Sequence, residues 1–295
     1  MSQTYKKLVG VLLCLALLFQ VASPAVAAVL PAVASGTVVH SNSKAKIDAS
    51  NVKDGYIMVA YTAKTQKRIK VRVTGPDKSV YTYDLNNTGK YEAFPLSAGE
   101  GKYKVGVYEN TSGNKYALAY SSDITVMLTN DFAPFLRPNQ YVNFTENSAV
   151  VKQAAVLVKD KKNDLEKITA VYNYVIKELT YDKEKAKTVR SGYIPDVDKV
   201  LASKKGICFD YASLMAAMLR SQGIPTKLVI GYAGNVYHAW IHTYIPEKGW
   251  IEGVIFFDGT TWKLMDPTYA SSSKQSKTIM EFIGNGSNYS SKYIY

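Results

Sequence analysis

The amino-acid sequence predicts an α+β protein, with an N-terminal antiparallel β-sandwich followed by a domain that joins a helical half to an antiparallel sheet. Three observations support this expectation. Short runs of alternating apolar and polar residues, separated by turn residues, fill residues 37–128. Helical periodicity replaces the alternation over residues 148–220. Alternation then returns over residues 227–265 and again over 289–295.

The first 34 residues have the composition of a secretory signal peptide. Two lysines precede an apolar run at residues 8–19, and small residues follow at 25–27 and 32–34, so we expect cleavage near residue 27 or 34. The apolar run is about 12 residues long, which is too short to span a bilayer. We therefore expect an exported protein without an integral membrane anchor after cleavage, either secreted or associated with the cell wall.

The composition limits the class of protein and of partner. A chain of 295 residues can form two domains, and an apolar content of 47% with 20% charged residues is typical of a globular protein. The net charge is +12, and removal of Lys6 and Lys7 with the signal peptide leaves +10. This charge favours anionic surroundings such as a cell wall, although solubility is the simpler interpretation. The lysines are scattered and form no nucleic-acid motif, so we expect no nucleic-acid partner.

The β-sandwich is predicted over residues 35–130. Its clearest strands are expected at 56–61, 69–73, 103–108 and 124–128, each bounded by glycine, asparagine or proline turns. This region contains no cluster of histidine, cysteine or acidic residues, so we expect it to support the second domain or to bind a substrate or wall polymer. An ordered linker is predicted over residues 131–147, because its aromatic residues would not stay in water: Phe132, Phe135, Tyr141 and Phe144.

The second domain is predicted over residues 148–295 and begins with helices. A first helix is expected at 148–159. Asn163 has the features of an N-cap, with Glu166 as its capping-box partner, and an apolar stripe follows it along a second helix. We expect a loop of extended character over 181–195 and a short helix over 196–203.

The rest of the second domain is expected to be a sheet. Strands are predicted at 227–232, 237–245, 250–256, 261–265 and 289–295. Hairpin turns are predicted at 246–249 and at Asp258-Gly259, and a polar loop with a short helix at 271–286.

Cys208 is the cysteine that remains once the predicted signal peptide, which contains Cys14, is removed. Apolar residues at helical spacing follow it, and Gly223 and Pro225 end that helix. Cys208 therefore lies at a helix N-terminus, where free backbone N–H groups and the helix dipole stabilise a thiolate. The position predicts a nucleophile, although a lone cysteine is more often a small buried apolar residue.

A cysteine nucleophile needs an imidazole and a group that orients it. His238 and His242 lie on one predicted strand, on the same face as Trp240, and Asp266 ends a later strand. Each residue alone is a weak indication. The ordered set of a cysteine at a helix start, a histidine on a strand and an aspartate at a strand end is far more specific.

The motifs around these residues resemble those of the transglutaminase-like superfamily over roughly residues 148–270. The matching segments are Lys205-Gly206-Ile207-Cys208-Phe209-Asp210-Tyr211-Ala212, Gly223-Ile224-Pro225-Thr226-Lys227, Gly231-Tyr232, His238-Ala239-Trp240, Trp262 and Asp266-Pro267-Thr268. The resemblance implies a papain-like fold in which Cys208 is the nucleophile, His238 the general base and acid, and Asp266 the residue that orients His238. Trp240 and Tyr211 are further candidates for substrate binding.

The implied chemistry is acyl transfer from a protein or peptide amide through a thioester, and we expect hydrolysis in preference to protein crosslinking. A non-enzymatic surface or scaffold module is the alternative from another class. No cofactor or metal is expected. His238 and His242 have the spacing of a zinc motif, but Ala239 replaces its glutamate and the segment reads as a strand. The resemblance does not imply calcium dependence, since the catalytic region contains no acidic cluster.

Overall fold

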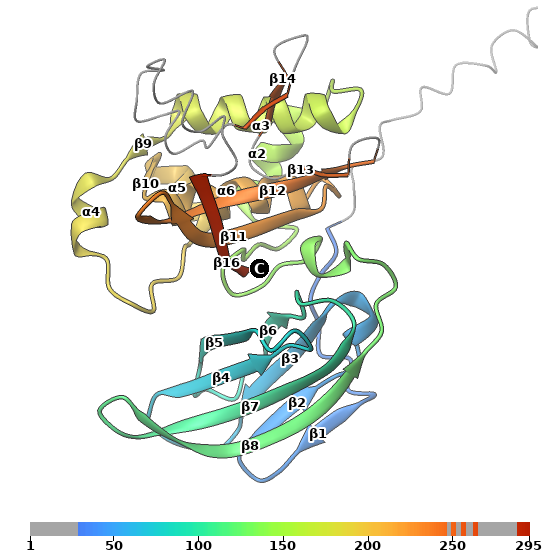
Figure 1. The fold of residues 1–295 in the computed structure, drawn as a ribbon, viewed down its shortest axis with the longest axis vertical. Coiled ribbons are helices and arrows are strands. Elements are labelled where there is room, and N and C mark those ends of the chain that lie inside the picture. Colours follow the sequence, from blue (N-terminus) through green and yellow to red (C-terminus); the bar gives the residue numbers. More distant parts are fainter. Residues whose placement is uncertain (1–28, 247–248, 252–254, 258–261, 265–287) are drawn as a thin grey trace, which may run out of the picture.

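The structure is a computed structural model that describes residues 29–246, 249–251, 255–257, 262–264 and 288–295. Most of the predicted signal peptide, the Asp258-Gly259 turn, the 271–286 loop and Asp266 lie outside these described residues. The described chain forms two units, one above the other in Figure 1, of which the lower is built of strands. Over the described ranges, no helix combines the length and apolar character that a membrane crossing requires.

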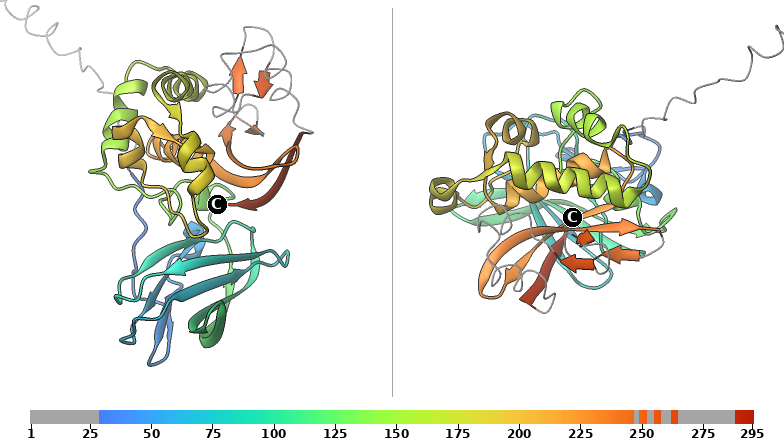
Figure 2. Two further views of the ribbon diagram at one scale, coloured as in Figure 1. Left: turned by 90° about the vertical axis from the view of Figure 1, so that its left-hand side faces the viewer. Right: turned by 90° about the horizontal axis from the view of Figure 1, so that it is seen from above.

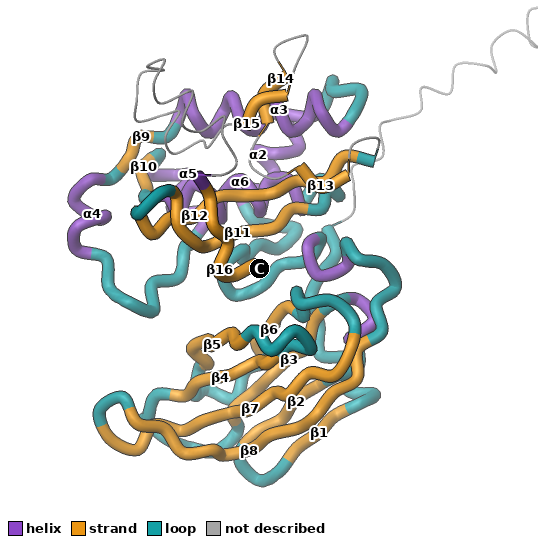
Figure 3. The backbone as a smooth tube through the Cα atoms, in the orientation of Figure 1, coloured by secondary structure: helices purple, strands orange, loops and turns teal. Residues whose placement is uncertain are grey.

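The lower unit is a sandwich of two antiparallel sheets, as the sequence predicts (Figure 3). One sheet has the order β1-β2-β3-β6, with strands Val39–Ser41, Ala45–Asp48, Tyr56–Tyr61 and Glu92–Pro95. The other has the order β5-β4-β7-β8, with strands Val80–Leu85, Ile69–Thr74, Gly101–Ser112 and Lys115–Val126. The four strands expected from alternation are β3, β4, β7 and β8, and β8 ends at Val126 rather than at residue 128.

Strand β3 departs from simple alternation because all six of its residues are buried. The residues on one face pack into the sandwich. On the other face, the hydroxyl of Tyr56 makes 3.2 Å hydrogen bonds with both the N–H and the carbonyl of Val33, so the segment that precedes β1 covers this strand. The short helix η1, Val52–Asp54, lies between β2 and β3.

The linker between the two units is ordered. It contains the short helix η2, Ala133–Phe135, and buries Phe135, Val142 and Phe144 to 4%, 0% and 3% exposure. Phe135 and Phe144 are therefore buried as expected, whereas Phe132 and Tyr141 are half-buried and pack against Tyr244 and Phe209.

Helices form one half of the upper unit. They are α2 (Ala149–Val158), α3 (Asp164–Glu178), α4 (Lys183–Thr188), α5 (Val197–Ser203) and α6 (Cys208–Arg220). Asn163 caps α3 as predicted, since its side-chain oxygen accepts the N–H of Glu166 at 2.9 Å. The Glu166 carboxylate reaches one residue further back than expected and accepts the N–H of Lys162 at 3.0 Å.

The expectation of an extended loop over residues 181–195 was wrong in its first part. Helix α4 occupies Lys183–Thr188, and the Asp182 side chain caps it by accepting the N–H of Lys185 at 2.9 Å. No residue of α4 is buried. A helix without an apolar face has no hydrophobic periodicity, so the pattern used to predict helices could not reveal it. Before it, β9 (Thr180–Tyr181) pairs in parallel with β10 (Lys205–Gly206).

The other half of the upper unit is an antiparallel sheet in the order β13-β12-β11-β16. Its strands are β11 (Thr226–Ala233), β12 (Val236–Ile245), β13 (Gly249–Ile251) and β16 (Tyr289–Ile294), and a separate hairpin joins β14 (Ile255–Phe257) to β15 (Trp262–Leu264). Helix α6 lies between this sheet and the other helices, and all its residues from Asp210 to Arg220 are buried. The α+β fold predicted from the sequence is therefore confirmed.

A cluster of tyrosines joins the two units, and Figure 2 shows the C-terminus lying between them. Its members come from β5, the linker and the C-terminal segment: Tyr81, Tyr83, Tyr141, Tyr293 and Tyr295. The ring of Tyr295 lies 5.5 Å from that of Tyr81 and 4.8 Å from that of Tyr141. The Ser97 hydroxyl also donates a 2.6 Å hydrogen bond to the carbonyl of Ile294. The two units therefore share a packed interface.

The buried side chain of Arg220, at the end of α6, binds the C-terminal segment by a hydrogen bond. Its guanidinium is 2% exposed and donates to three carbonyl oxygens from separate parts of the chain, those of Thr226 (2.8 Å), Arg137 (2.8 Å) and Tyr295 (2.7 Å). Burial lowers the pKa of Arg220 to about 9, so the guanidinium remains protonated at neutral pH. The Arg220 side chain thereby connects α6 to β11, to the linker and to Tyr295, the residue that follows β16.

Candidate active site

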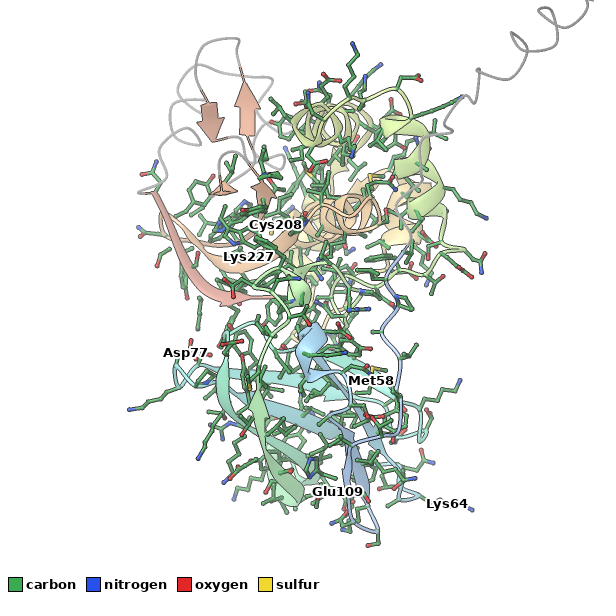
Figure 4. The ribbon with its side chains drawn as sticks, turned by 90° about the vertical axis from the view of Figure 1, so that its right-hand side faces the viewer. Met58, Lys64, Asp77, Glu109, Cys208 and Lys227 are labelled. Atoms are coloured by element: carbon green, nitrogen blue, oxygen red, sulfur yellow. The ribbon has the colours of Figure 1, made fainter. Side chains whose placement is uncertain are left out.

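Cys208 is the first residue of α6, and Ile207 is the N-cap. Figure 4 shows Cys208 in the upper unit, well away from Asp77 and Glu109 of the sandwich. The side chain is partly exposed. The first backbone N–H groups of a helix have no intrahelical acceptor, so the N–H of Cys208 is available to an oxygen beside its own sulfur. The prediction that Cys208 begins a helix is confirmed.

Asp210 fixes the geometry of this helix start. Its carboxylate is 0% exposed and accepts the N–H of Ile207 at 2.8 Å. A Cβ atom at Gly206 would lie 2.5 Å from the Cβ of Asp210, so only glycine allows the aspartate to fold back in this way. The sequence explains the local structure: glycine two residues before the cysteine and aspartate two residues after it make one N-terminal turn.

The same carboxylate also holds the segment that follows α4. Lys185 Nζ donates to Asp210 Oδ2 at 2.6 Å, and the Tyr193 hydroxyl donates to Asp210 Oδ1 at 2.5 Å. Lys185 also donates to the Tyr193 oxygen at 2.6 Å. Burial and the bond to Asp210 raise the pKa of Tyr193, so its phenol stays protonated and continues to donate. We call Lys185, Tyr193 and Asp210 the clamp, because together they fix residues 185–193 against the start of α6.

His238 comes from β12 and is 5% exposed. It pairs with Gly231 of β11, and a Cβ at Gly231 would lie 2.0 Å from the carbonyl oxygen of Ser290 and 2.9 Å from the Trp240 ring. Glycine at 231 therefore lets β16 and Trp240 approach β11 closely beside the histidine. The ring of Trp240 lies nearly parallel to that of His238, with centres 6.3 Å apart and an angle of 19° between the planes.

His242 lies on the same strand, but its ring is already engaged. The Trp240 indole N–H donates to His242 Nε2 at 2.8 Å, so this nitrogen carries no proton. Burial, with a smaller contribution from Lys227, lowers the pKa of His242 to about 4. His242 is therefore neutral at physiological pH and acts as a fixed acceptor for Trp240, which leaves His238 as the histidine of the candidate site.

This assignment predicts the pH dependence of stability. The unfolded chain protonates His242 near pH 6.5, whereas the folded protein protonates it only near pH 4. Its contribution is therefore complete above pH 6.5 and is lost as the pH falls toward 4, to a limit of about 3 kcal/mol. We expect the free energy of unfolding of the native protein to fall more steeply over this range than that of His242→Gln, which keeps an acceptor for Trp240. Urea denaturation at pH 7, 5.5 and 4.5 measures the difference, and parallel curves would contradict the assignment.

A cavity of about 640 Å³ brings Cys208 and His238 together. Tyr237, the neighbour of His238, also lines this cavity, and its pKa is raised mainly by burial and then by Tyr293, Tyr232 and Cys208. Besides α6 and β12, the walls come from residues 186–193, the C-terminal tyrosines and, in the sandwich, Val80 and Thr82 of β5. A second cavity of about 590 Å³, beside the linker, is lined by neither cysteine nor histidine.

Trp240 and Tyr211 do not occupy the place expected of substrate-binding residues. Tyr211 is 0% and Trp240 3% exposed, and neither lines the cavity. Tyr211 packs behind the nucleophile, with its ring 6.5 Å from that of Tyr181, and Trp240 supports the two histidines. Both residues shape the site from behind its wall.

The clamp is the part of the site that sequence reasoning missed. The only available indication was Asp210 at the third position of a helix, which is typical of a capping residue. Nothing in the sequence spacing connects it to Lys185 or Tyr193. Arg190, which lines the cavity, was missed as well. The guanidinium of Arg190 makes no hydrogen bond or ion pair with any described residue.

Comparison with known proteins identifies the family of this region. Residues 152–253 match the model of the transglutaminase-like superfamily. An uncharacterized Bacillus subtilis protein, YebA, is 32% identical over 118 residues, which are 33% of this chain and 16% of that protein. A protein-glutamine gamma-glutamyltransferase of Pseudomonas aeruginosa is 34% identical over 86 residues, covering 24% of this chain and 11% of the other.

Among solved structures, the periplasmic domain of TgpA from Pseudomonas aeruginosa is 18% identical with a TM-score of 0.37, covering 83% of this chain and 100% of that one. The similarity to the curated relatives is therefore confined to a small part of each of them. The superfamily that the sequence motifs indicated is confirmed by the match of residues 152–253, the region that contains Cys208 and His238.

Proposed function

We propose that this transglutaminase-like region is a cysteine enzyme that performs acyl transfer on protein or peptide amides, with Cys208, His238 and Asp266 as its triad. The observation that carries the proposal is that a cysteine at a helix N-terminus and a histidine on a strand line one cavity, in a region that matches the superfamily model. Asp266 enters by its motif, as the residue that would orient His238.

In the proposed mechanism, the Cys208 thiolate attacks the carbonyl carbon of the amide and the free N–H of Cys208 stabilises the resulting oxyanion. His238 gives its proton to the leaving amine, which departs as the thioester forms. His238 then removes a proton from the acceptor, which attacks the thioester and releases Cys208. Residues 186–193 form the wall from which a second oxyanion donor would come.

We favour water as the acceptor. Among the described residues that line the cavity, Arg190 is the charged side chain apart from the catalytic groups. A lysine substrate would bring an ammonium group toward this cation. The nearby carboxylate of Asp84, which lies beside Gly192 of the wall, is already paired with Lys70 at 2.6 Å. Hydrolysis needs only that water reach the thioester, so the enzyme is proposed to be a protease or amidase.

Protein crosslinking is the second candidate, because one relative of the region is a protein-glutamine gamma-glutamyltransferase. The proposed location is outside the cell, secreted or on the cell wall, as the sequence of residues 1–34 indicates. Peptide-bearing anionic wall material is the proposed substrate environment, consistent with a positively charged chain.

Incubation of the protein with casein and a fluorescent primary amine tests these proposals together. We expect chain cleavage or ammonia release in the native protein, little covalent label in the casein, and neither product with Cys208→Ala. Mass spectrometry follows the three products. Label that depends on Cys208 and appears without cleavage would replace the hydrolase by a transferase. If iodoacetamide modifies Cys208 at pH 6 no faster than it modifies a model peptide, the scaffold interpretation would be favoured instead.

A further inference from the structure

Strand β5 of the sandwich has one open edge. It is the outer strand of its sheet and pairs only with β4 among the described strands. The Gly75 N–H donates to the Ser79 carbonyl at 2.9 Å, which makes this a hydrogen-bonded pair at the turn between β4 and β5. In an antiparallel ladder such pairs alternate with pairs whose backbone groups face outward. The N–H and carbonyl groups of Val80 and Thr82 therefore face away from β4.

A contact from the linker supports this orientation independently. Asp84, two residues after Thr82, belongs to the same outward-facing set. Its carbonyl accepts a hydrogen bond from Gln140 Nε2 at 2.6 Å. One end of the open edge is thus capped by a side chain, while no described residue is recorded as a hydrogen-bond partner of the outward groups of Val80 and Thr82.

This open edge lies at the candidate active site. Val80 and Thr82 line the same cavity as Cys208 and His238. Tyr141 connects the two sides of the cavity, because its ring is 5.7 Å from that of Tyr83 in β5 and 5.4 Å from that of Phe209, the residue after Cys208. The rings of Tyr83, Tyr141 and Phe209 therefore form a row of contacts that links β5 to the residue after Cys208.

The edge has the chemistry of a peptide-binding strand. Exposed edge strands in proteins are commonly blocked by charged residues, proline or bulges, and Val80 and Thr82 are none of these. Unpaired backbone N–H and carbonyl groups bind an extended polypeptide by adding it as another strand. The side chain of Thr82 is exposed and does not cover the backbone groups at the edge.

We propose that the acyl-donor substrate is an extended polypeptide that adds as a strand to the open edge of β5 and thereby presents its amide to Cys208. The inference rests on the proposed function and assigns its substrate site: the sandwich supplies the backbone that holds the substrate, and the upper unit supplies the chemistry. Because backbone groups make the contacts, this part of the site selects extended conformation rather than particular side chains.

Two thiol-directed probes test the proposal: iodoacetamide, and an iodoacetylated pentapeptide of alternating serine and valine. The rate of Cys208 modification by each is divided by its rate with glutathione. One hydrogen bond contributes a net factor of roughly 2 to 10 to binding. The normalised rate of Cys208 modification by the peptide is therefore expected to exceed that by iodoacetamide at least about 10-fold in the native protein. Methylation of the peptide's backbone nitrogens is expected to remove most of this advantage.

Thr82→Pro removes one outward N–H without taking a ladder hydrogen bond from β4. It is expected to reduce the peptide's advantage over iodoacetamide by about 3- to 10-fold. Val39→Pro is the matched control. Val39 lies on the outer strand β1, and the bond from the Ala49 N–H to the Val38 carbonyl places the N–H of Val39 on the open edge, away from the cavity. It should leave both rates at the native values.

Different failures have different meanings. Rapid modification by iodoacetamide without any advantage for the peptide would overturn the strand-addition site and leave the proposed enzyme intact. Slow modification by both reagents would overturn both proposals. Thr82→Ala keeps the N–H, so a loss equal to that of Thr82→Pro would assign the effect to the side chain and overturn the proposal. If Thr82→Pro does not fold, equal rates for methylated and unmethylated peptides with the native protein would do the same.

Discussion

Replacement of Cys208 by alanine is expected to lower turnover at least about 10⁴-fold, because no other group can form the thioester. His238→Ala is expected to cost a similar factor, since the two residues act as one unit in proton transfer and attack. Asp266→Ala is expected to be milder, because this residue would orient His238 without transferring a proton. Release of ammonia or of new chain ends, measured with each purified variant, gives the three factors.

His242→Gln is the matched control for these variants. It changes a histidine four residues from His238 on the same strand and keeps an acceptor for the Trp240 indole. It should therefore retain most of the activity near neutral pH. If His242→Gln is inactive and His238→Ala is active, the base has been assigned to the wrong histidine.

Arg220→Met is expected to lower the free energy of unfolding by about 3–5 kcal/mol. Methionine fills much of the space, but the carbonyl oxygens of Thr226, Arg137 and Tyr295 each lose the hydrogen bond from the guanidinium. The oxygen of Tyr295 keeps its 2.9 Å hydrogen bond from the N–H of Leu228. The loss should also weaken the interface between the units, since the Tyr295 ring packs on Tyr81 and Tyr141. Urea denaturation at pH 7 measures the change.

Lys199→Met provides the comparison for Arg220. Lys199 forms an ion pair with Asp196 in which the two side chains are 85% and 49% exposed, so its removal should change stability by less than about 1 kcal/mol. Equal effects of the two substitutions would mean that the buried hydrogen bonds of Arg220 contribute little more than a surface pair.

The parts of the fold that the sequence predicted are those whose side chains meet opposite environments on their two faces. Strand β4 and residues 102–105 of β7 alternate between buried and more exposed residues, and α3 has one apolar stripe, so their periods are visible in the sequence. Helix α4 has no buried residue and therefore no period. Strand β3 was predicted at its observed bounds although all six of its residues are buried, because turn residues bound an apolar run there.

The residues of the candidate site also divide into those that the sequence could predict and those that it could not. Cys208 and His238 could be found because chemistry restricts their residue types and the superfamily motifs surround them. The clamp could not be found, since Lys185 and Tyr193 acquire their role only through the packing of residues 185–193 against Asp210. Nor could any local pattern show that β5, more than 120 residues before Cys208 in the sequence, would border the cavity. Asp266 remains a prediction.

The tyrosines at the interface between the two units limit whether the region that contains Cys208 and His238 could be moved into another protein by itself. The segment that matches the superfamily model, residues 152–253, includes the nucleophile and the histidine but not Val80, Tyr141 or Tyr293, which line their cavity. A graft of that segment into another protein would transfer Cys208 and His238 without these residues of the cavity wall. Under the proposed strand-addition site, recombination between relatives would therefore have to exchange the sandwich and the region of residues 152–253 together.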